Sequence, residues 1–325
     1  MRRHAPATLL LLLALCFLHH PSAAAGRRLA GPRASTKPPI SNPPMFLLFT
    51  HDDGVAAQDT KVVLALTDAH RNPNGCKLPA TWFACTKGCS GFDCTTAKSL
   101  HSRGHELADH TVHHDSLRTK SRSTIQKEIL KARDTIAACG IPPADIAGFR
   151  SPFLADSPDV RSVLSAAGFR YDSSVGAVGG SARPWPAAIK GGFPFDCSVG
   201  GNKCSSSESY PKLWELPLYE TPDHNLMNYC TDESSGKPRR GCDVYTELKK
   251  DFDAAYRGNR GPMTIAIHTP YLHNSNFSAG IARFLGYALG KKDVWAVTMS
   301  QLLDWMQHPV PASQMKTFMK KYACP

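Results

Sequence analysis

Short apolar runs alternate with helical patterns from Met45 almost to the end of the chain, and this alternation limits the fold more than any other feature. Strands that are separated by helices and apolar throughout are buried and pair in parallel, so the pattern predicts an α/β architecture. The predicted strands are 45–50, 80–85, 105–109, 146–150, 169–173, 213–218, 263–268 and 294–298. The predicted helices are 60–70, 95–103, 123–138, 158–167, 245–256, 281–289 and 300–306.

Eight predicted strands favour a distorted (β/α) barrel of seven or eight parallel strands, with an open sheet as the alternative. Two segments, 175–212 and 221–241, interrupt the alternation and are rich in Gly, Pro and Ser. Because cysteines lie within both segments, we interpret them as loops that disulfides hold in place. The sequence therefore predicts a single domain with disulfide-pinned loops.

The N-terminus has the parts of a secretory signal peptide over residues 1–25. A basic start at Arg2 and Arg3 is followed by an apolar run over 9–18 and by small residues at 22–25. The apolar run is short for a bilayer crossing, which favours a cleaved signal over an uncleaved anchor, the alternative. We expect a secreted protein, extracellular or in a cell wall, with no membrane attachment after cleavage.

The rest of the chain divides by composition. Residues 26–44 are rich in Pro and Ser and lack apolar periodicity, which predicts a linker. The alternating pattern fills 45–308 and defines the domain. Residues 309–325 are expected to be a C-terminal tail that Cys324 ties to the domain.

The cysteine count agrees with export. Eleven cysteines include Cys16 in the predicted signal, and the remaining ten are an even number. In an oxidising compartment this count predicts five disulfides, whose pairing the spacing leaves open. Cys85, Cys89 and Cys94 are compatible with a metal knuckle, but no second ligand pair at C-x2-C spacing supports it. Asn276 begins an Asn-Phe-Ser acceptor for N-glycosylation, so we expect a glycoprotein if the host is a eukaryote.

The chain is basic, with 38 Lys and Arg against 27 Asp and Glu and a net charge of +11. Without Arg2 and Arg3 the charge is 36 − 27 = +9. The basic residues are dispersed and form neither a stripe with aromatic residues nor a zinc-finger spacing. We therefore expect a solvated basic surface and no nucleic-acid partner. A composition of 42% hydrophobic and 20% charged residues excludes collagen, a coiled coil and a mainly disordered chain.

Reactive side chains gather where the predicted strands end. In a barrel the carboxyl ends of the strands lie on one side, and active sites form there. The strand ends that carry carboxylate, imidazole or guanidinium groups are 50–54, 110–114, 150–153, 214–217 and 267–269. Surface polarity alone does not explain five such ends, so the sequence predicts a site at this side of the sheet.

The residue types at these ends suit a metal. Asp52 and Asp53 project to different sides of the chain, so one can bind a metal while the other moves protons; a solvated turn is the alternative. His110 and His114 are four residues apart, which lets two imidazoles share one face of a helical turn. One carboxylate and two imidazoles leave a position open for water, as in catalytic zinc sites.

Two other hydrolase signatures do not match. His105-Glu106 begins like the H-E-x-x-H zinc protease signature, but Asp109 stands where the second histidine belongs. The sequence also contains no G-x-S-x-G nucleophile elbow, which argues against a serine hydrolase.

Four motifs in order give the chain a family resemblance. They are THDDG at 50–54, HTVHH at 110–114, RSPF at 150–153 and AIH at 266–268. In this order they resemble the polysaccharide deacetylases, also called the NodB homology domain or the fourth family of carbohydrate esterases. The resemblance covers 46–307 and is closest to the secreted chitin deacetylases of animals and fungi. It implies that 45–308 is a catalytic domain.

The resemblance also implies roles for the strand-end residues. Asp52 would be the general base, and Arg150 would pair with it and hold it ionised. Asp53, His110 and His114 would bind Zn²⁺, for which Co²⁺ or Mn²⁺ could substitute.

The remaining roles concern the oxyanion, the general acid and the contact with the sugar ring. The backbone N–H of Phe153 would help stabilise the oxyanion, and His268 would be the general acid. Asp172 is the candidate for the family's aspartate that orients this histidine, with a structural turn as the alternative. Trp185 and Trp214 either wall a sugar ring or belong to the core.

Some residues depart from the family pattern. His51 replaces a Phe, Val55 a frequent Pro, Phe153 a Tyr and Ala266 a Leu. None of these changes removes a metal ligand or a proton-transfer group. His51 bears on the pH optimum, because an imidazole there adds a charge beside the base.

The function that these features predict is zinc-dependent hydrolysis. The enzyme would remove N-acetyl groups from N-acetylglucosamine units of chitin or a related cell-wall polysaccharide, release acetate and act as a monomer. One alternative is a non-catalytic carbohydrate-binding wall protein on the same fold. The other is a polysaccharide O-deacetylase of the acetylxylan type, since the site chemistry suits an amide and an ester alike.

Overall fold

The computed structural model describes residues 34–198, 201–222, 226–232, 235 and 237–324. The chain divides into two compact units, Met1–Ala30 and Gly31–Pro325. The predicted signal peptide 1–25 and residues 26–33 of the predicted linker 26–44 lie outside the described residues, and both segments stay predictions. The fold described below is that of the second unit.

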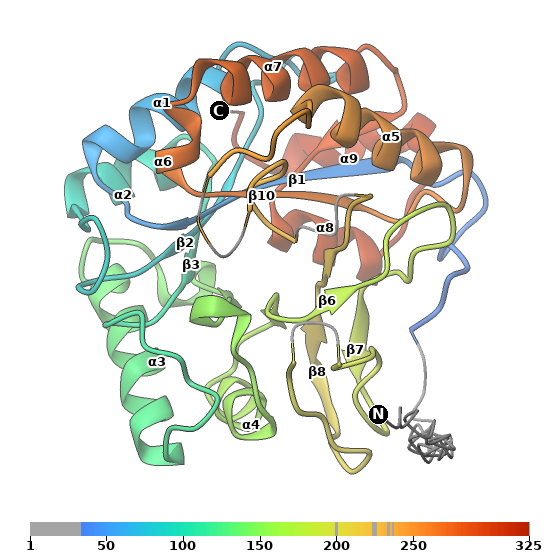
Figure 1. Cartoon of the computed structure of the whole chain (residues 1–325). Coiled ribbons are helices and arrows are strands. Elements are labelled where there is room, and N and C mark those ends of the chain that lie inside the picture. The colour runs from blue at the N-terminus through green and yellow to red at the C-terminus, as the bar shows by residue number, and fades with distance from the viewer. Residues whose placement is uncertain (1–33, 199–200, 223–225, 233–234, 236, 325) are drawn as a thin grey trace, which may run out of the picture. The chain divides into compact units, whose positions relative to one another are not determined.

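A nine-stranded sheet forms the centre of this unit, in the order β10-β1-β2-β3-β4-β5-β8-β7, with β11 also paired to β1. Its strands are β1 Met45–Asp53, β2 Thr81–Ala84, β3 Glu106–Asp109, β4 Gly148–Phe149, β5 Tyr171–Asp172, β7 Ala187–Ile189, β8 Tyr210–Glu215, β10 Met263–Ile267 and β11 Val294–Ala296. Among the described strands of this sheet every pairing is parallel except that of β7 with β8. The sheet curls into a half-barrel with helices around it (Figure 1), which confirms the predicted α/β class.

The half-barrel is not a closed ring, because β10 and β7 stand at opposite ends of the strand order. A second, two-stranded sheet of β6 Gly176–Ala177 and β9 Leu218–Tyr219 lies near β10. The prediction that 175–212 is a loop is therefore partly wrong. Short strands form there because apolar side chains such as Trp185 and Ile189 are buried in the core.

In the described residues, all the α-helices except α1, α6 and α9 begin where a side chain accepts a hydrogen bond from a free N–H group. They are α1 Ala57–Thr67, α2 Cys94–Ser102, α3 Arg122–Ala137, α4 Pro158–Ala166, α5 Val244–Arg257, α6 Thr269–Leu272, α7 Ser275–Leu289, α8 Met299–Gln307 and α9 Met315–Phe318. Asp93 caps α2, Asp243 caps α5, and Thr298 forms a capping box at α8. Helix α7 begins several residues before the predicted start, because Asn274 accepts hydrogen bonds from its first N–H groups, so Asn276 lies in the first turn of a helix.

The core forms on both faces of β1, as the period of two requires. Met45, Leu47 and Phe49 pack into one apolar cluster with α5 and α7. Phe46 and Leu48 pack into another with the C-terminal helix α8. Because β1 is buried on both faces, its residues are apolar along its first part. Its polar residues lie at its end, where the candidate site lies.

Five disulfides join the ten cysteines, which confirms the predicted count. They are Cys76–Cys324, Cys85–Cys89, Cys94–Cys139, Cys197–Cys204 and Cys230–Cys242. Two of them close the loop segments 175–212 and 221–241, as predicted. A metal knuckle of the kind considered for the three clustered cysteines is excluded, because each of these is bonded to another cysteine.

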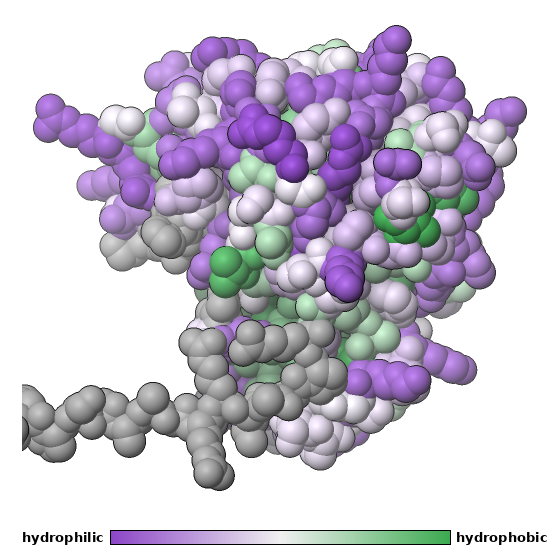
Figure 2. Space-filling model, turned by 90° about the vertical axis from the view of Figure 1, so that its right-hand side faces the viewer, coloured by the Kyte–Doolittle hydropathy of each residue, from purple (hydrophilic) through white to green (hydrophobic). Residues whose placement is uncertain are grey.

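The surface is polar for most of its extent. Figure 2 shows hydrophilic side chains spread over one face and apolar ones in small, separate groups. Among the described residues, the large hydrophobic side chains that stand exposed are Phe153 and Val178. No helix in the described part of the chain has the length and apolar character that crossing a bilayer requires.

Candidate active site

A pocket of about 570 Å³ opens at the carboxyl ends of the central strands. Its polar lining comes from Asp52, Asp53, His110, His114, Asn228 and His268. Its apolar lining comes from Phe153, Leu154, Met227, Pro270 and Tyr271. The structure thus brings together, in one pocket, the ends of β1, β3 and β10 that the sequence singled out.

Three of these side chains form a candidate metal site. Asp53 Oδ1 lies 3.1 Å from His114 Nε2 and 3.6 Å from His110 Nε2. One ligand atom from each residue lies within 4.8 Å of the others. Burial disfavours ionisation of Asp53, but hydrogen bonds from the two histidines outweigh it and lower the pKa of this carboxyl. An anionic oxygen facing two imidazoles suits a divalent cation.

The turn that carries the two histidines is not helical, which corrects the expectation of a shared helical face. Thr111 and His114 both have positive φ, of 69° and 59°, so the chain doubles back after β3. Asp109 Oδ1 accepts the Thr111 N–H, and Thr111 Oγ1 accepts the His114 N–H. The imidazoles still meet, with ring centroids 5.0 Å apart. The HTVHH motif therefore brings the ligands together through side-chain hydrogen bonds.

A backbone contact fixes the ring of His110. Its Nδ1 donates to the carbonyl oxygen of Arg150 at 2.7 Å, which turns Nε2 toward Asp53. When Nε2 gives up its proton, its lone pair is available to a metal ion. Such a partner behind a ligand sets the tautomer and orientation of metal-binding histidines. The residues present therefore fit a metal ion.

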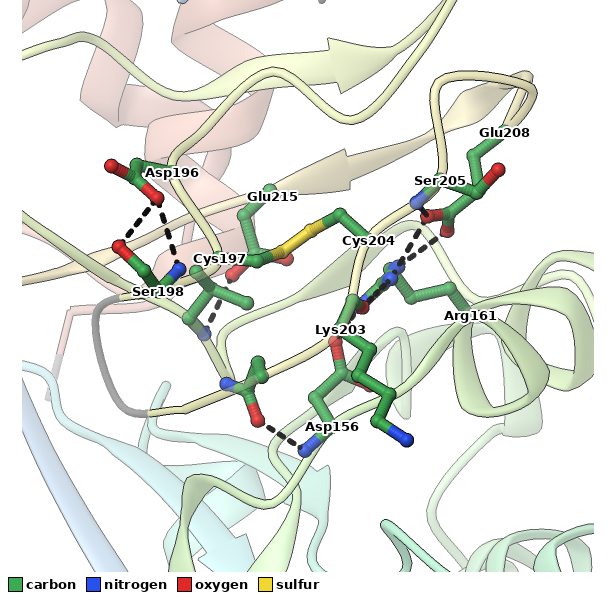
Figure 3. The surroundings of a disulfide bond; sticks show 12 residues. Asp156, Arg161, Asp196, Cys197, Ser198, Lys203, Cys204, Ser205, Glu208 and Glu215 are labelled. Carbon is green, nitrogen blue, oxygen red and sulfur yellow. Dashed lines mark hydrogen bonds and ion pairs between the residues drawn. A yellow bond between two sulfur atoms is a disulfide. The ribbon is translucent and has the colours of Figure 1, made fainter. Parts of the chain in front are cut away.

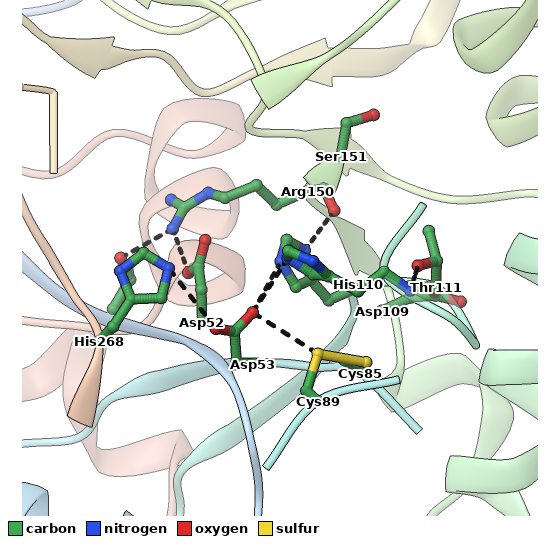
Figure 4. A network of polar contacts seen from close by, with 12 residues as sticks. Asp52, Asp53, Cys85, Cys89, Asp109, His110, Thr111, Arg150, Ser151 and His268 are labelled. Carbon is green, nitrogen blue, oxygen red and sulfur yellow. Dashed lines mark hydrogen bonds and ion pairs between the residues drawn. A yellow bond between two sulfur atoms is a disulfide. The ribbon is translucent and has the colours of Figure 1, made fainter. Parts of the chain in front are cut away.

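Asp52 belongs to a buried ion pair beside this cluster (Figure 4). Arg150 Nη1 donates to Asp52 Oδ1 at 2.6 Å, and the guanidinium lies over the ring of Phe83. Arg150 also donates to Thr50 Oγ1 and to the carbonyl oxygen of Ser173. Removing two charges from water is costly unless they pair and their other hydrogen bonds are satisfied, and here both conditions hold.

His268 stands across the pocket, with Nε2 at 3.8 Å from Asp53 Oδ2. Its partner is Asn228, whose Oδ1 accepts the His268 backbone N–H at 2.9 Å and whose amide nitrogen lies 2.9 Å from the ring Nδ1. Burial lowers the pKa of His268, although the charges of Asp52 and Asp53 act in the opposite direction. Sequence reasoning missed Asn228, because it lies in the insert 221–241 and belongs to no motif.

The structure does not bring Asp172 to His268, which corrects the proposed orienting role. Asp172 is fully buried at the end of β5, where its Oδ1 accepts the Ser174 hydroxyl. Burial, and then the neighbouring Asp156, raise its pKa well above the usual range. Glu215, at the end of β8, is buried beside it and accepts the backbone N–H of Val175. These carboxyl groups face the interior and not the pocket.

The two candidate tryptophans also lie away from the pocket. Trp185 is 2% exposed and stacks on Trp305 with ring centroids 5.7 Å apart. Trp214 packs against the same core cluster. The structure therefore favours the core alternative for both.

Phe153 and His51 have contrasting positions. Phe153 has positive φ and a side chain that is 69% exposed at the rim of the pocket, where its ring meets His114. His51 is buried on the other side of β1, where its Nε2 lies 2.7 Å from Thr269 Oγ1. Burial, and then the charge of His268, lower the pKa of His51 to about 4.

At its strand ends the curled parallel sheet holds a candidate metal site and an ion-paired carboxylate in one pocket, an arrangement that fits a metal-dependent hydrolase. The family model of polysaccharide deacetylase matches residues 41–171, and these residues contain three of the four motifs. Residues 41–171 therefore match the family that the sequence motifs predicted.

Individual relatives agree with this assignment. Chitin deacetylase 1 of Bombyx mori is 26% identical over 296 residues, which cover 86% of this chain and 54% of that protein. Chitin deacetylase 8 of the same species is 23% identical, with 87% of this chain and 75% of that protein covered. The chain therefore spans about half the length of the first relative.

Solved structures show the same fold. A Mycobacterium smegmatis protein assigned to the polysaccharide deacetylases is 19% identical, has a TM-score of 0.56, and is matched over 86% of this chain and 96% of its own. PuuE allantoinase is 18% identical with a TM-score of 0.53, over 82% of this chain and 94% of its own. Because an allantoinase has this fold too, the fold alone does not define the substrate.

Proposed function

We propose that this protein is a metal-dependent deacetylase that hydrolyses N-acetyl groups of N-acetylglucosamine units in chitin or a related cell-wall polysaccharide and releases acetate. One observation carries the proposal: the cluster of Asp53, His110 and His114 shares its pocket with the buried pair of Asp52 and Arg150. The names of the insect relatives support chitin as the substrate class.

Zinc is the proposed ion, with Co²⁺ or Mn²⁺ as substitutes. Asp53, His110 and His114 would hold it, since one carboxylate and two imidazoles leave a position open. A bound zinc ion would supply a Lewis acid for the acetyl carbonyl and a water of lowered pKa.

The side chains around the cluster would move the protons. Asp52 would accept a proton from the attacking water, and Arg150 holds its carboxylate in place at 2.6 Å. His268 would donate a proton to the leaving amine from the opposite wall, with Asn228 fixing its ring. The backbone N–H of Phe153 would stabilise the developing oxyanion.

The apolar rim suits a pyranose ring and an acetyl methyl group. Phe153 and Tyr271 lie at this rim, and both present aromatic surface that can cover the apolar face of a sugar. Phe153 and Tyr271 would thus make the sugar contact that was one of the two predicted roles of Trp185 and Trp214.

The remaining features support a location outside the cell. Residues 1–25 would be a cleaved signal, 26–44 a linker, 45–308 the catalytic domain and 309–325 a tail, which Cys324 ties to Cys76. Five disulfides suit an oxidising compartment, and the exposed Asn276 would accept a glycan. The chain would act as a monomer and without nucleic acid.

Acetate release tests the proposal directly. The purified protein is assayed on N-acetylglucosamine oligomers and on acetylxylan, each with and without a chelator. Chelator-sensitive release from the oligomers supports the proposal. Release from acetylxylan alone would show an O-deacetylase, and binding of oligomers without any release would show a non-catalytic wall protein.

A further inference from the structure

The disulfide Cys85–Cys89 lies directly against the candidate metal site (Figure 4). Cys89 Sγ is 3.6 Å from Asp53 Oδ1, and its residue is partly exposed. Cys85 is 1% exposed, and its Sγ lies 3.6 Å from the carbonyl oxygen of Val112. The two sulfurs of one bond thus differ, because the carboxylate of a proposed metal ligand adjoins one of them and a backbone carbonyl adjoins the other.

The distances around Asp53 suit a fourth ligand at Cys89. From Asp53 Oδ1, the His114 Nε2, His110 Nε2 and Cys89 Sγ atoms are 3.1, 3.6 and 3.6 Å away. In a tetrahedral zinc site the oxygen and nitrogen ligands are roughly 3.3 Å apart, and an oxygen and a sulfur roughly 3.6 Å apart. The separation of the sulfur from Asp53 Oδ1 is therefore that of a sulfur ligand, while in the oxidised protein Cys89 stands outside the group whose ligand atoms all lie within 4.8 Å of one another.

Backbone hydrogen bonds hold the segment that precedes Cys89, and none of them involves a sulfur atom. The N–H groups of Lys87 and Gly88 both donate to the Val112 carbonyl oxygen at 2.9 Å, and the Cys85 N–H donates to the Asp53 carbonyl oxygen. A Cβ at Gly88 would lie 2.1 Å from the carbonyl oxygen of His113, so glycine allows this close approach.

We propose that Cys89 is a latent fourth metal ligand and that the Cys85–Cys89 disulfide withholds it. This rests on the metal site of the proposed function. In the oxidised protein the disulfide sulfur is a poor ligand, so three protein ligands leave a position open. In the reduced protein the Cys89 thiolate completes a four-ligand site of the closed type, which is structural and not catalytic.

The redox step balances with a thiol reductant. One thiolate of the reductant attacks Cys89 Sγ, forms a mixed disulfide and releases Cys85 as a thiol. A second reductant thiol attacks the mixed disulfide, so two electrons and two protons pass to the protein and the reductant becomes a disulfide. When the Cys89 thiol coordinates the metal, its proton passes to solvent.

Two matched variants test this proposal without a reductant. Cys85→Ser frees the sulfur that faces Asp53, and Cys89→Ser frees the sulfur that faces Val112. Both lose the same disulfide, so they differ only in which thiol remains. Each is loaded with Co²⁺ and measured by absorption spectroscopy, by competition with a chelator and by acetate release, with circular dichroism to check the fold.

We expect a sulfur-to-cobalt charge-transfer band in Cys85→Ser and none in Cys89→Ser or in the oxidised wild type. Cobalt should bind about tenfold more tightly or better to Cys85→Ser than to Cys89→Ser. Acetate release should be at least about tenfold lower in Cys85→Ser, because its open position is filled. Reducing the cobalt-loaded wild type with a phosphine should produce the same band, which covers the case in which a variant does not fold.

The outcomes separate this proposal from the proposed function. Identical spectra of the two variants, with no band on reduction of the wild type, overturn the latent ligand while the three-ligand site stands. Cobalt binding that appears only in Cys85→Ser, with its band, supports the latent ligand and contradicts the three-ligand site. If none of the proteins binds cobalt, both proposals fall.

Discussion

Among the described residues, Arg150, Arg161 and Arg183 are buried in ion pairs, and the first two lie in contrasting surroundings. Of these two networks, only that of Arg150 opens on a pocket. Arg150 pairs with Asp52 and lies over the ring of Phe83, beneath the candidate metal cluster. Arg161 pairs with Asp156 and Glu208 and lies over the ring of Phe193, in a similar arrangement. The chemistry of the two arginines is alike, so the surroundings decide their roles.

The difference is what covers each network. The loop closed by Cys197–Cys204 lies over the Arg161 network, and Arg161 also donates to the carbonyl oxygen of Lys203 in that loop (Figure 3). The neighbouring Asp172 and Glu215 have strongly raised pKa values, chiefly because of burial. Near Arg161, carboxyl groups with shifted pKa values therefore belong to a buried, structural network. Beside Arg150, in contrast, lie a pocket and the candidate metal ligands. A perturbed pKa indicates a functional site only together with access.

The largest effect should come from removing the metal. Chelation is expected to abolish acetate release, because the ion that Asp53 and the two histidines would hold is needed to polarise the acetyl carbonyl and to activate the water. The melting temperature should fall only by what a bound ligand contributes, since five disulfides and the core hold the fold. The assay is run with calorimetry on the same samples. Cooperative unfolding of the chelated protein at room temperature would make the site structural.

Exchanging each arginine for methionine should separate the two networks. Arg161→Met leaves Asp156 and Glu208 buried without a partner and should reduce the free energy of unfolding by about 3–5 kcal/mol. Arg150→Met should reduce acetate release far more than Arg161→Met does, per folded molecule. Urea unfolding followed by rate measurement below the transition gives both quantities. Equal losses of acetate release in folded Arg150→Met and folded Arg161→Met would contradict the difference between the two networks.

Asn228 lies in the pocket and contacts His268, the proposed general acid. Asn228→Ala removes both contacts to His268 and should lower kcat by about 10- to 100-fold. KM should change little, because the ring loses its orientation while the apolar rim stays. Steady-state kinetics measures the split, and Asn228→Asp provides the control because it keeps the shape. A rise in KM with kcat unchanged would place Asn228 in substrate binding.

The smallest effect concerns a buried histidine outside both networks. His105 accepts the Ala80 N–H at Nδ1, and burial, then the charge of Arg103, lower its pKa to about 4. Between this value and the usual value near 6.5 the unfolded chain binds a proton that the folded chain does not, so its contribution is full above pH 6.5 and is lost as pH falls toward 4. From pH 7 to 5 this should cost about 2 kcal/mol of unfolding free energy, and His105→Gln should lack that loss. Parallel pH profiles for the two proteins would refute this.

Most of the fold could be predicted from the sequence, because the strands are apolar on both faces and end in reactive residues. The ligand set could also be predicted, since Asp53, His110 and His114 lie in short motifs next to strands. Positive φ at Thr111 and His114 brings the rings together, and a spacing of four residues does not distinguish this turn from a helical one.

The positions of Asn228 and the two tryptophans could not be predicted, because they depend on contacts between segments that are distant in the chain. Asn228 reaches His268 because its backbone N–H donates to Ala266 of β10, a pairing that no local pattern in the insert indicates. Trp185 is buried because it stacks on Trp305, which is far away in the chain. Residues whose role is set by such contacts cannot be placed from periodicity, which describes only neighbours along one element.

The central claim is that adjacent aspartates divide the work, with Asp53 holding the metal and Asp52 moving the proton. Metal content measured by mass spectrometry on Asp52→Asn and Asp53→Asn, beside their rates of acetate release, tests it most directly. Asp52→Asn should retain the metal while its rate falls by about 10² to 10⁴. Asp53→Asn should lose the metal and recover part of its activity at high metal concentration, because a neutral amide replaces a charged ligand. Asp52→Asn purified without metal, together with Asp53→Asn that keeps it, would contradict the assignment.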